Sequence, residues 1–172
     1  MLRRLKSFGL PGNELVNLYK TFILPKLTYA SPAWSSRLGV GQKDRLERVQ
    51  KRAMKISLGP SFTDYHLDLD SHNLLPLAVP KDEKNHSERT IYHQALLRFG
   101  YKLFNHPYYC QYFLGGRLSA PHYNLRHPKI VKEISAKRNR YKFSPLPSIA
   151  RALNEEEKRK KEEIENRNLA AN

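Results

Sequence analysis

Hydrophobic residues recur along most of this chain with the period of an α-helix, and the stretch from Gln42 to Leu58 shows it most clearly. Its apolar positions are spaced by three and four residues: Leu46, Val49, Ala53 and Ile56. This spacing predicts one apolar stripe that packs against a neighbour. Gly59 and Pro60 follow, and they predict a helix end, because glycine tolerates the left-handed cap conformation and proline cannot continue a helix.

Similar periodicity predicts helices on both sides of this stretch. Before it, a short helix ends at Gly9, and a broad apolar face from Leu15 to Ile23 indicates a helix that is buried on more than one side. After it, residues 61–77 predict one or two short helices, and Tyr92 to Leu103 predict a longer one. Residues 143–154 predict a short packed element, and residues 155–172 a charged helix with almost no apolar stripe.

These elements predict an all-α fold. We expect a small helical bundle over residues 1–60, a second helical segment with a basic loop over residues 61–154, and a solvated helical tail over residues 155–172.

Charge changes the interpretation of the helix predicted from Gln42 to Leu58, which we call the central helix. The 172 residues hold 31 Lys and Arg against 16 Asp and Glu, a formal net charge of +15, which favours a polyanionic partner. From Glu155 onward there are five basic and six acidic residues, so the excess belongs to the first 154 residues.

Two sets of basic residues are candidates for phosphate contact. The first lies on the central helix and comprises Lys43, Arg45, Arg48, Lys51, Arg52 and Lys55. The second lies in a polar stretch that interleaves tyrosines with eight Lys and Arg, and comprises Arg117, Arg126, Arg138 and Arg140. The plainer alternatives are a surface helix whose charges are only solvated, and a flexible basic loop.

Other candidate sites are weaker. Asp64, Asp68 and Asp70 lie near His66 and His72, but residues two apart on a helix do not face each other, and aspartates at helix starts need no metal to explain them. We therefore predict no metal site and no cofactor for this chain.

The sequence also bears on the cellular compartment. Cys110 is the single cysteine, so it predicts a small buried side chain and neither an intramolecular disulfide nor a cysteine-rich zinc site. No stretch is apolar enough for a membrane span, and the first residues do not open a signal peptide. We expect an intracellular protein, nuclear or cytoplasmic.

Three phrases together resemble the region just after the polymerase core in reverse transcriptases of non-LTR retrotransposons, particularly the jockey-like LINE elements. They are LRRLKSFGLP, ELVNLYKTFILPKLTYASPAW and LERVQKRAMKISLG, with weaker echoes in LLRFGYKLFNHP, YNLRHP and RYKFSPLPSIARALN. The resemblance extends over about residues 2 to 154. It implies that residues 1–60 are a thumb-like domain, which grips primer and template, and that residues 61–154 are the helical C-terminal extension.

The same resemblance limits the expected activity. These polymerases use Mg²⁺ held by an (F/Y)-x-D-D turn in the palm and an upstream aspartate, and the sequence contains no such turn. We therefore expect no catalysis by the isolated chain, but sequence-independent binding of RNA, DNA or a hybrid. Alternatives are association with a separately encoded palm, a module that docks on another protein through the face from Leu15 to Ile23, or a remnant without function.

Overall fold

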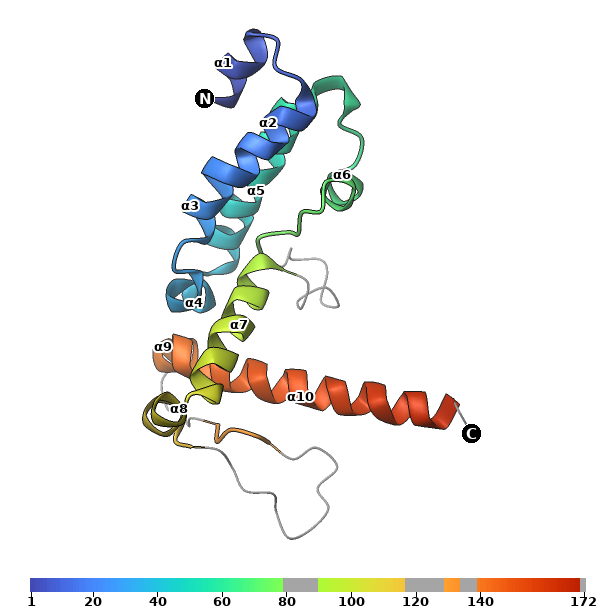
Figure 1. Cartoon of the computed structure of the whole chain (residues 1–172). Helices are drawn as coiled ribbons and strands as arrows, with labels where there is room; N and C mark the ends of the chain where they lie inside the picture. Colours follow the sequence, from blue (N-terminus) through green and yellow to red (C-terminus); the bar gives the residue numbers. More distant parts are fainter. Residues whose placement is uncertain (79–89, 117–128, 134–138, 171–172) are drawn as a thin grey trace. The chain divides into compact units, whose positions relative to one another are not determined.

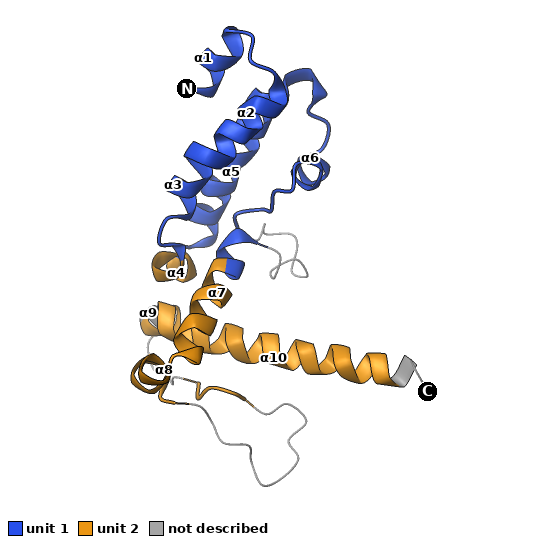
Figure 2. Cartoon of the chain, in the orientation of Figure 1, with its two compact units in different colours: residues 1–31, 38–94 blue, residues 32–37, 95–172 orange. Residues whose placement is uncertain are grey.

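The computed structural model describes residues 1–78, 90–116, 129–133 and 139–170. The regular elements of these residues are all helical, apart from an isolated bridge at Val131, so the predicted all-α class is confirmed (Figure 1). The chain divides into two compact units, residues 1–31 with 38–94, and residues 32–37 with 95–172 (Figure 2).

Unit 1 is built on two antiparallel helical rods. One rod is a continuous run of short helices, and the other is the long basic helix, α5 (Figure 1). The helices of unit 1 are α1 (Leu2–Ser7), α2 (Gly12–Leu18), the π-helix η1 (Tyr19–Ile23), α3 (Leu24–Thr28), α5 (Val40–Leu58), the 3₁₀-helix η3 (Gly59–Ser61) and α6 (Tyr65–Ser71).

The core of unit 1 lies between these rods. Leu15, Val16 and Tyr19 are fully buried and pack in one cluster with Met54 of α5. The broad apolar face predicted from Leu15 to Ile23 is thus largely covered within the unit, and Phe22 is its most exposed large side chain. Burial of this face therefore needs no second protein at Leu15, Val16 or Tyr19.

Unit 2 holds the remaining helices: most of α4 (Ser31–Trp34), the 3₁₀-helix η2 (Ser35–Arg37), most of α7 (Ile91–Asn105), α8 (Pro107–Leu114), α9 (Asn139–Lys142) and α10 (Pro145–Ala170). Its core comprises Leu96, Leu103, Leu114, Val131, Ile149 and Leu153, with smaller residues between them. The Asn154 side chain fixes the segment at Val131, since its Oδ1 accepts from the Ile130 and Val131 amides, each at 3.1 Å, and its Nδ2 donates to the Val131 carbonyl at 3.0 Å.

Two boundaries differ from the sequence-based segments. Tyr65, Leu69 and Leu74 are buried in the unit 1 core, so residues 61–78 belong with the first bundle and not with the second segment. The predicted break near residue 154 is also absent, because α10 is one helix across it. Glu157 and Lys160, within the predicted tail, bond the Tyr101 hydroxyl at 3.1 and 2.8 Å, whereas the side chains of residues 161–168 are exposed.

The approach of α7 to α10 depends on Gly100. A Cβ at this position would lie 2.9 Å from Ile149 Cγ2 and 3.3 Å from Leu153 Cγ. We expect Gly100→Leu to overpack this contact and to lower the free energy of unfolding by about 2 to 3 kcal/mol. Urea denaturation followed by circular dichroism measures the change.

Gly41 provides the contrast, because a Cβ there meets nothing within 4 Å. In α5, Gly41→Ala is expected to raise the free energy of unfolding by about 0.5 to 1 kcal/mol, since alanine loses less conformational freedom in a helix. Equal stability of Gly100→Leu and the parent would show that the α7–α10 contact is looser than this geometry indicates.

Candidate nucleic-acid interface

Helix α5 has well-formed ends. At its start, the Gln42 side-chain oxygen accepts from the Gly39 amide at 2.9 Å, which satisfies one of the amides that a helix leaves without a partner. At its end, Gly59 takes a positive φ of 60° and its amide bonds the Lys55 carbonyl. The predicted helix from Gln42 to Leu58, with its end at Gly59, is confirmed.

The buried side of α5 differs from the predicted stripe. Its buried residues are Gln50, Ala53, Met54 and Ser57. Val49, which was predicted to pack, is 45% exposed, so that assignment was wrong. The helix is rotated because two polar side chains, Glu47 and Gln50, find hydrogen-bond partners on the inside, and apolar spacing alone does not reveal them.

Five basic side chains occupy the opposite side of α5. Arg45, Arg48, Lys51, Arg52 and Lys55 are all exposed, and we call them the α5 basic row. Spacings of three and four residues place Arg45, Arg48, Arg52 and Lys55 along one line of the helix. Within the described ranges, none of the five makes a hydrogen bond or an ion pair with a carboxylate. Their charges are therefore available to a polyanion.

Lys43 is the exception among the six predicted contacts. Its side chain is half-buried, and spacings of four and three place it on the same side of α5 as Glu47 and Gln50. We therefore leave it out of the basic row.

Two aromatic rings support the row from the segment that follows α5. Lys51 Nζ lies 5.5 Å from the centroid of the Tyr65 ring, and Lys55 Nζ lies 5.4 Å from that of Phe62. Attraction between an ammonium and a ring face limits the side-chain conformations without neutralising the charge. The two lysines are thus partly ordered before any ligand binds.

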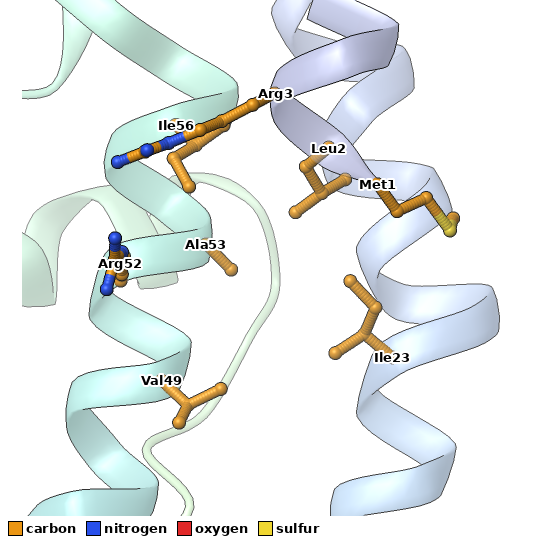
Figure 3. A pocket seen from close by; sticks show the side chains of 8 residues that line it. All are labelled: Met1, Leu2, Arg3, Ile23, Val49, Arg52, Ala53 and Ile56. Carbon is orange, nitrogen blue, oxygen red and sulfur yellow. The ribbon is translucent and has the colours of Figure 1, made fainter.

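A pocket of about 360 Å³ lies beside the row, between α5 and the α1 and η1 helices (Figure 3). Ile23, Val49 and Ile56 contribute apolar side chains, and Arg52 belongs to the row itself. Arg3 of α1 extends toward α5 and also lines the pocket (Figure 3). Sequence reasoning missed Arg3, although the Arg3-Arg4 pair in a short amphipathic helix was its one available signal.

A half-buried carboxyl group anchors α5 on its inner side. Glu47 accepts from the Tyr65 hydroxyl and from the amides of Leu77 and Ala78, the latter at 3.0 and 3.1 Å. Burial raises the pKa of Glu47 above its usual value, and these hydrogen bonds offset part of the effect. Burial and the nearby Glu47 charge also raise the pKa of Tyr92 to about 12. Glu47 thus ties α5 to α6 and to residues 77–78.

A second polar side chain on the inner side of α5, the buried amide of Gln50, carries no charge. The Tyr19 hydroxyl donates to Gln50 Oε1 at 3.0 Å, and Gln50 Nε2 donates to the Leu75 carbonyl at 2.9 Å. Buried amides are tolerated when they are paired in this way. Together with Glu47, this network fixes the rotation of α5 and so directs the basic row to solvent.

The pKa of Glu47 predicts how stability changes with pH. Below the usual pKa of 4.5 the carboxyl group is protonated in both states. As pH rises through that value, the unfolded chain loses its proton while the folded chain keeps it, so Glu47 lowers the stability until pH passes the folded pKa. As pH rises from 4.5 toward the raised folded pKa, we expect the stability of the parent to fall relative to that of Glu47→Gln. Urea titrations at several pH values measure the difference, and parallel curves would contradict the raised pKa.

The structure does not describe the side chains of the remaining predicted contacts. Arg117, Arg126 and Arg138 lie outside the described residues, and Arg140 lies in α9 with a side chain that is also outside them. Cys110 is buried, as expected.

Two of the three aspartates considered as metal ligands, Asp64 and Asp68, have structural partners. Asp64 caps α6 by accepting from the His66 and Leu67 amides, and Asp68 accepts from the Thr63 amide at 3.1 Å. The hydrogen bonds from the Leu67 and His66 amides also lower the pKa of Asp64. In the part of the chain that the structure describes, no three His, Cys, Asp or Glu side chains are grouped as metal ligands would be.

No described helix combines the length and apolar character needed to cross a membrane. Comparison with protein-family models finds no match to this chain, and comparisons with curated proteins and with solved structures find none either.

Proposed function

We propose that this chain is the thumb and C-terminal region of a non-LTR retrotransposon reverse transcriptase, and that it binds primer–template nucleic acid without sequence preference. The proposal is supported by the α5 basic row, in which five exposed cations lie on one side of a single helix and pair with no carboxylate among the described residues. The order of sequence phrases supports the family.

The chemistry of the row suits a phosphate backbone better than a base edge. Its residues follow one side of a single helix, and cations arranged in this way neutralise successive phosphates and release their counterions. The pocket beside the row adds Arg3 and places two guanidinium groups next to apolar side chains. A phosphate could meet the arginines while the carbon atoms of a sugar contact Val49 and Ile56.

The isolated chain is proposed to bind nucleic acid without catalysing its synthesis, because its sequence lacks the palm motif of the polymerase family. RNA-directed DNA synthesis with Mg²⁺ would belong to the palm. Primer extension that appears only after a separately produced palm is added would support this division of roles. Extension by the chain alone would contradict it.

Direct titration tests sequence-independent binding. The full chain is added to a fluorescein-labelled RNA/DNA hybrid at about 0.05 M salt, and anisotropy reports the bound fraction. Hybrids of unrelated base sequence are expected to bind with affinities within about threefold of one another, because phosphate contacts carry no sequence information. Absence of binding at this salt concentration, or a strong preference for one sequence, would overturn the proposal.

A further inference from the structure

Helix α8 of unit 2 exposes an unusual number of aromatic rings. Four of its eight residues are large exposed aromatics: Tyr108, Tyr109, Tyr112 and Phe113, which are 66, 43, 71 and 37% exposed. Cys110 and Leu114 are buried and anchor its other side. We call the four exposed rings the α8 aromatic row. Exposed clusters of large apolar side chains commonly mark a binding surface.

The rings of this row support one another. Tyr108 and Tyr112 are nearly parallel, at an interplanar angle of 8° and a centroid separation of 6.1 Å. Phe113 lies edge-on to Tyr112 at 4.9 Å, and His106 stacks on Tyr109 at 4.3 Å. Such contacts restrict the side-chain conformations, so the flat faces are ordered before a ligand arrives.

The composition of α8 indicates what these faces would bind. The helix sequence, PYYCQYFL, has no charged residue, so its exposed side offers no cation to a phosphate. Its one large aliphatic residue, Leu114, is buried, which leaves flat rings, tyrosine hydroxyls and the Gln111 amide on the exposed side. Every nucleobase has a π-face that stacks on such rings. A chain with a net charge of +15 also attracts nucleic acid more strongly than it attracts an apolar protein surface.

From these observations we infer that the α8 aromatic row is a stacking surface for the unpaired bases of single-stranded nucleic acid. The α8 aromatic row belongs to unit 2 and recognises bases, whereas the α5 basic row belongs to unit 1 and recognises phosphates. It does not depend on the function proposed for α5.

The test compares two labelled oligonucleotides of about twelve nucleotides, an oligothymidylate and an abasic strand with the same phosphates. The full parent chain is expected to bind the oligothymidylate at least about tenfold more tightly than the abasic strand, since only the former can stack. Tyr108→Ala with Tyr112→Ala is expected to weaken oligothymidylate binding by about tenfold, to the level of the abasic strand, and to leave abasic binding unchanged. Because both side chains are mostly exposed, helicity by circular dichroism should match the parent.

Two controls separate stacking from other effects. Tyr108→Phe with Tyr112→Phe keeps the rings and should bind as the parent does. Tyr29→Ala removes an 80% exposed tyrosine from unit 1 and should also have no effect. Changes in the α5 basic row should weaken both strands equally, so failure of that proposal would be seen separately.

Three results would overturn the inference. One is equal affinity of the parent for the two strands, and another is no binding of either strand. The third is a preference for bases that survives loss of Tyr108 and Tyr112, which would place base stacking elsewhere on the chain.

Discussion

Changing Arg48, Arg52 and Lys55 together to glutamine is expected to weaken binding of an RNA/DNA hybrid by about two to three orders of magnitude at about 0.1 M salt. Each phosphate contact contributes close to tenfold in affinity at this salt concentration through counterion release. The three side chains are exposed, lie on one line of α5 and pair with no described carboxylate, so their loss should not disturb the fold. Fluorescence anisotropy with the full chain measures the change.

A matched control carries the same loss of charge at another place. Lys158, Lys161 and Arg167 are exposed on the last part of α10, where residues from Glu155 onward hold six glutamates against five Lys and Arg. Changing these three to glutamine also lowers the net charge from +15 to +12, but is expected to alter affinity by less than about threefold. Equal weakening by the two triple variants would mean that overall charge, and not the α5 basic row, determines binding.

The second large effect concerns stability. Glu47→Ala is expected to lower the free energy of unfolding by about 3 to 4 kcal/mol. The substitution leaves the Tyr65 hydroxyl and the Leu77 and Ala78 amides without their acceptor, and an unpaired buried donor costs about 1 to 3 kcal/mol. The substitution therefore weakens the contacts that join α5 to α6 and to residues 77–78. Urea denaturation measures the free energy directly.

Glu14→Ala is the appropriate comparison because it makes the same chemical change at an exposed position of α2. We expect it to alter stability by no more than about 0.5 kcal/mol. If Glu47→Ala cost no more than Glu14→Ala, the hydrogen bonds of Glu47 would contribute nothing to the packing of α5.

Apolar periodicity and turn residues predict much of this fold. The end of α5 at Gly59 and the burial of Leu15, Val16 and Tyr19 follow from local rules that tertiary structure does not override here. Long-range polar contacts do not follow from such rules. Glu47 and Gln50 look like surface residues in the sequence. Their hydrogen-bond partners, however, lie far away in the chain, at residue 19 before α5 and at residues 65, 75, 77 and 78 after it.

The basic row shows the same division. Counting charges finds its five members but also includes Lys43, because the count ignores the rotation of the helix that Glu47 and Gln50 impose. It misses Arg3, which reaches the pocket only because α1 lies near α5. Tyr108, Tyr109, Tyr112 and Phe113 are visible in the sequence as an aromatic group, whereas their exposure depends on which side of α8 packs.

The most direct test of the central claim is the slope of log affinity against log salt for the full chain and an RNA/DNA hybrid. Five phosphate contacts predict a slope of about −4 to −5, and loss of Arg48, Arg52 and Lys55 predicts about −2. The triple control on α10 should keep the parent's slope. A parent slope near zero, or the same slope in the parent and in the variant that lacks Arg48, Arg52 and Lys55, would contradict a phosphate grip by the α5 basic row.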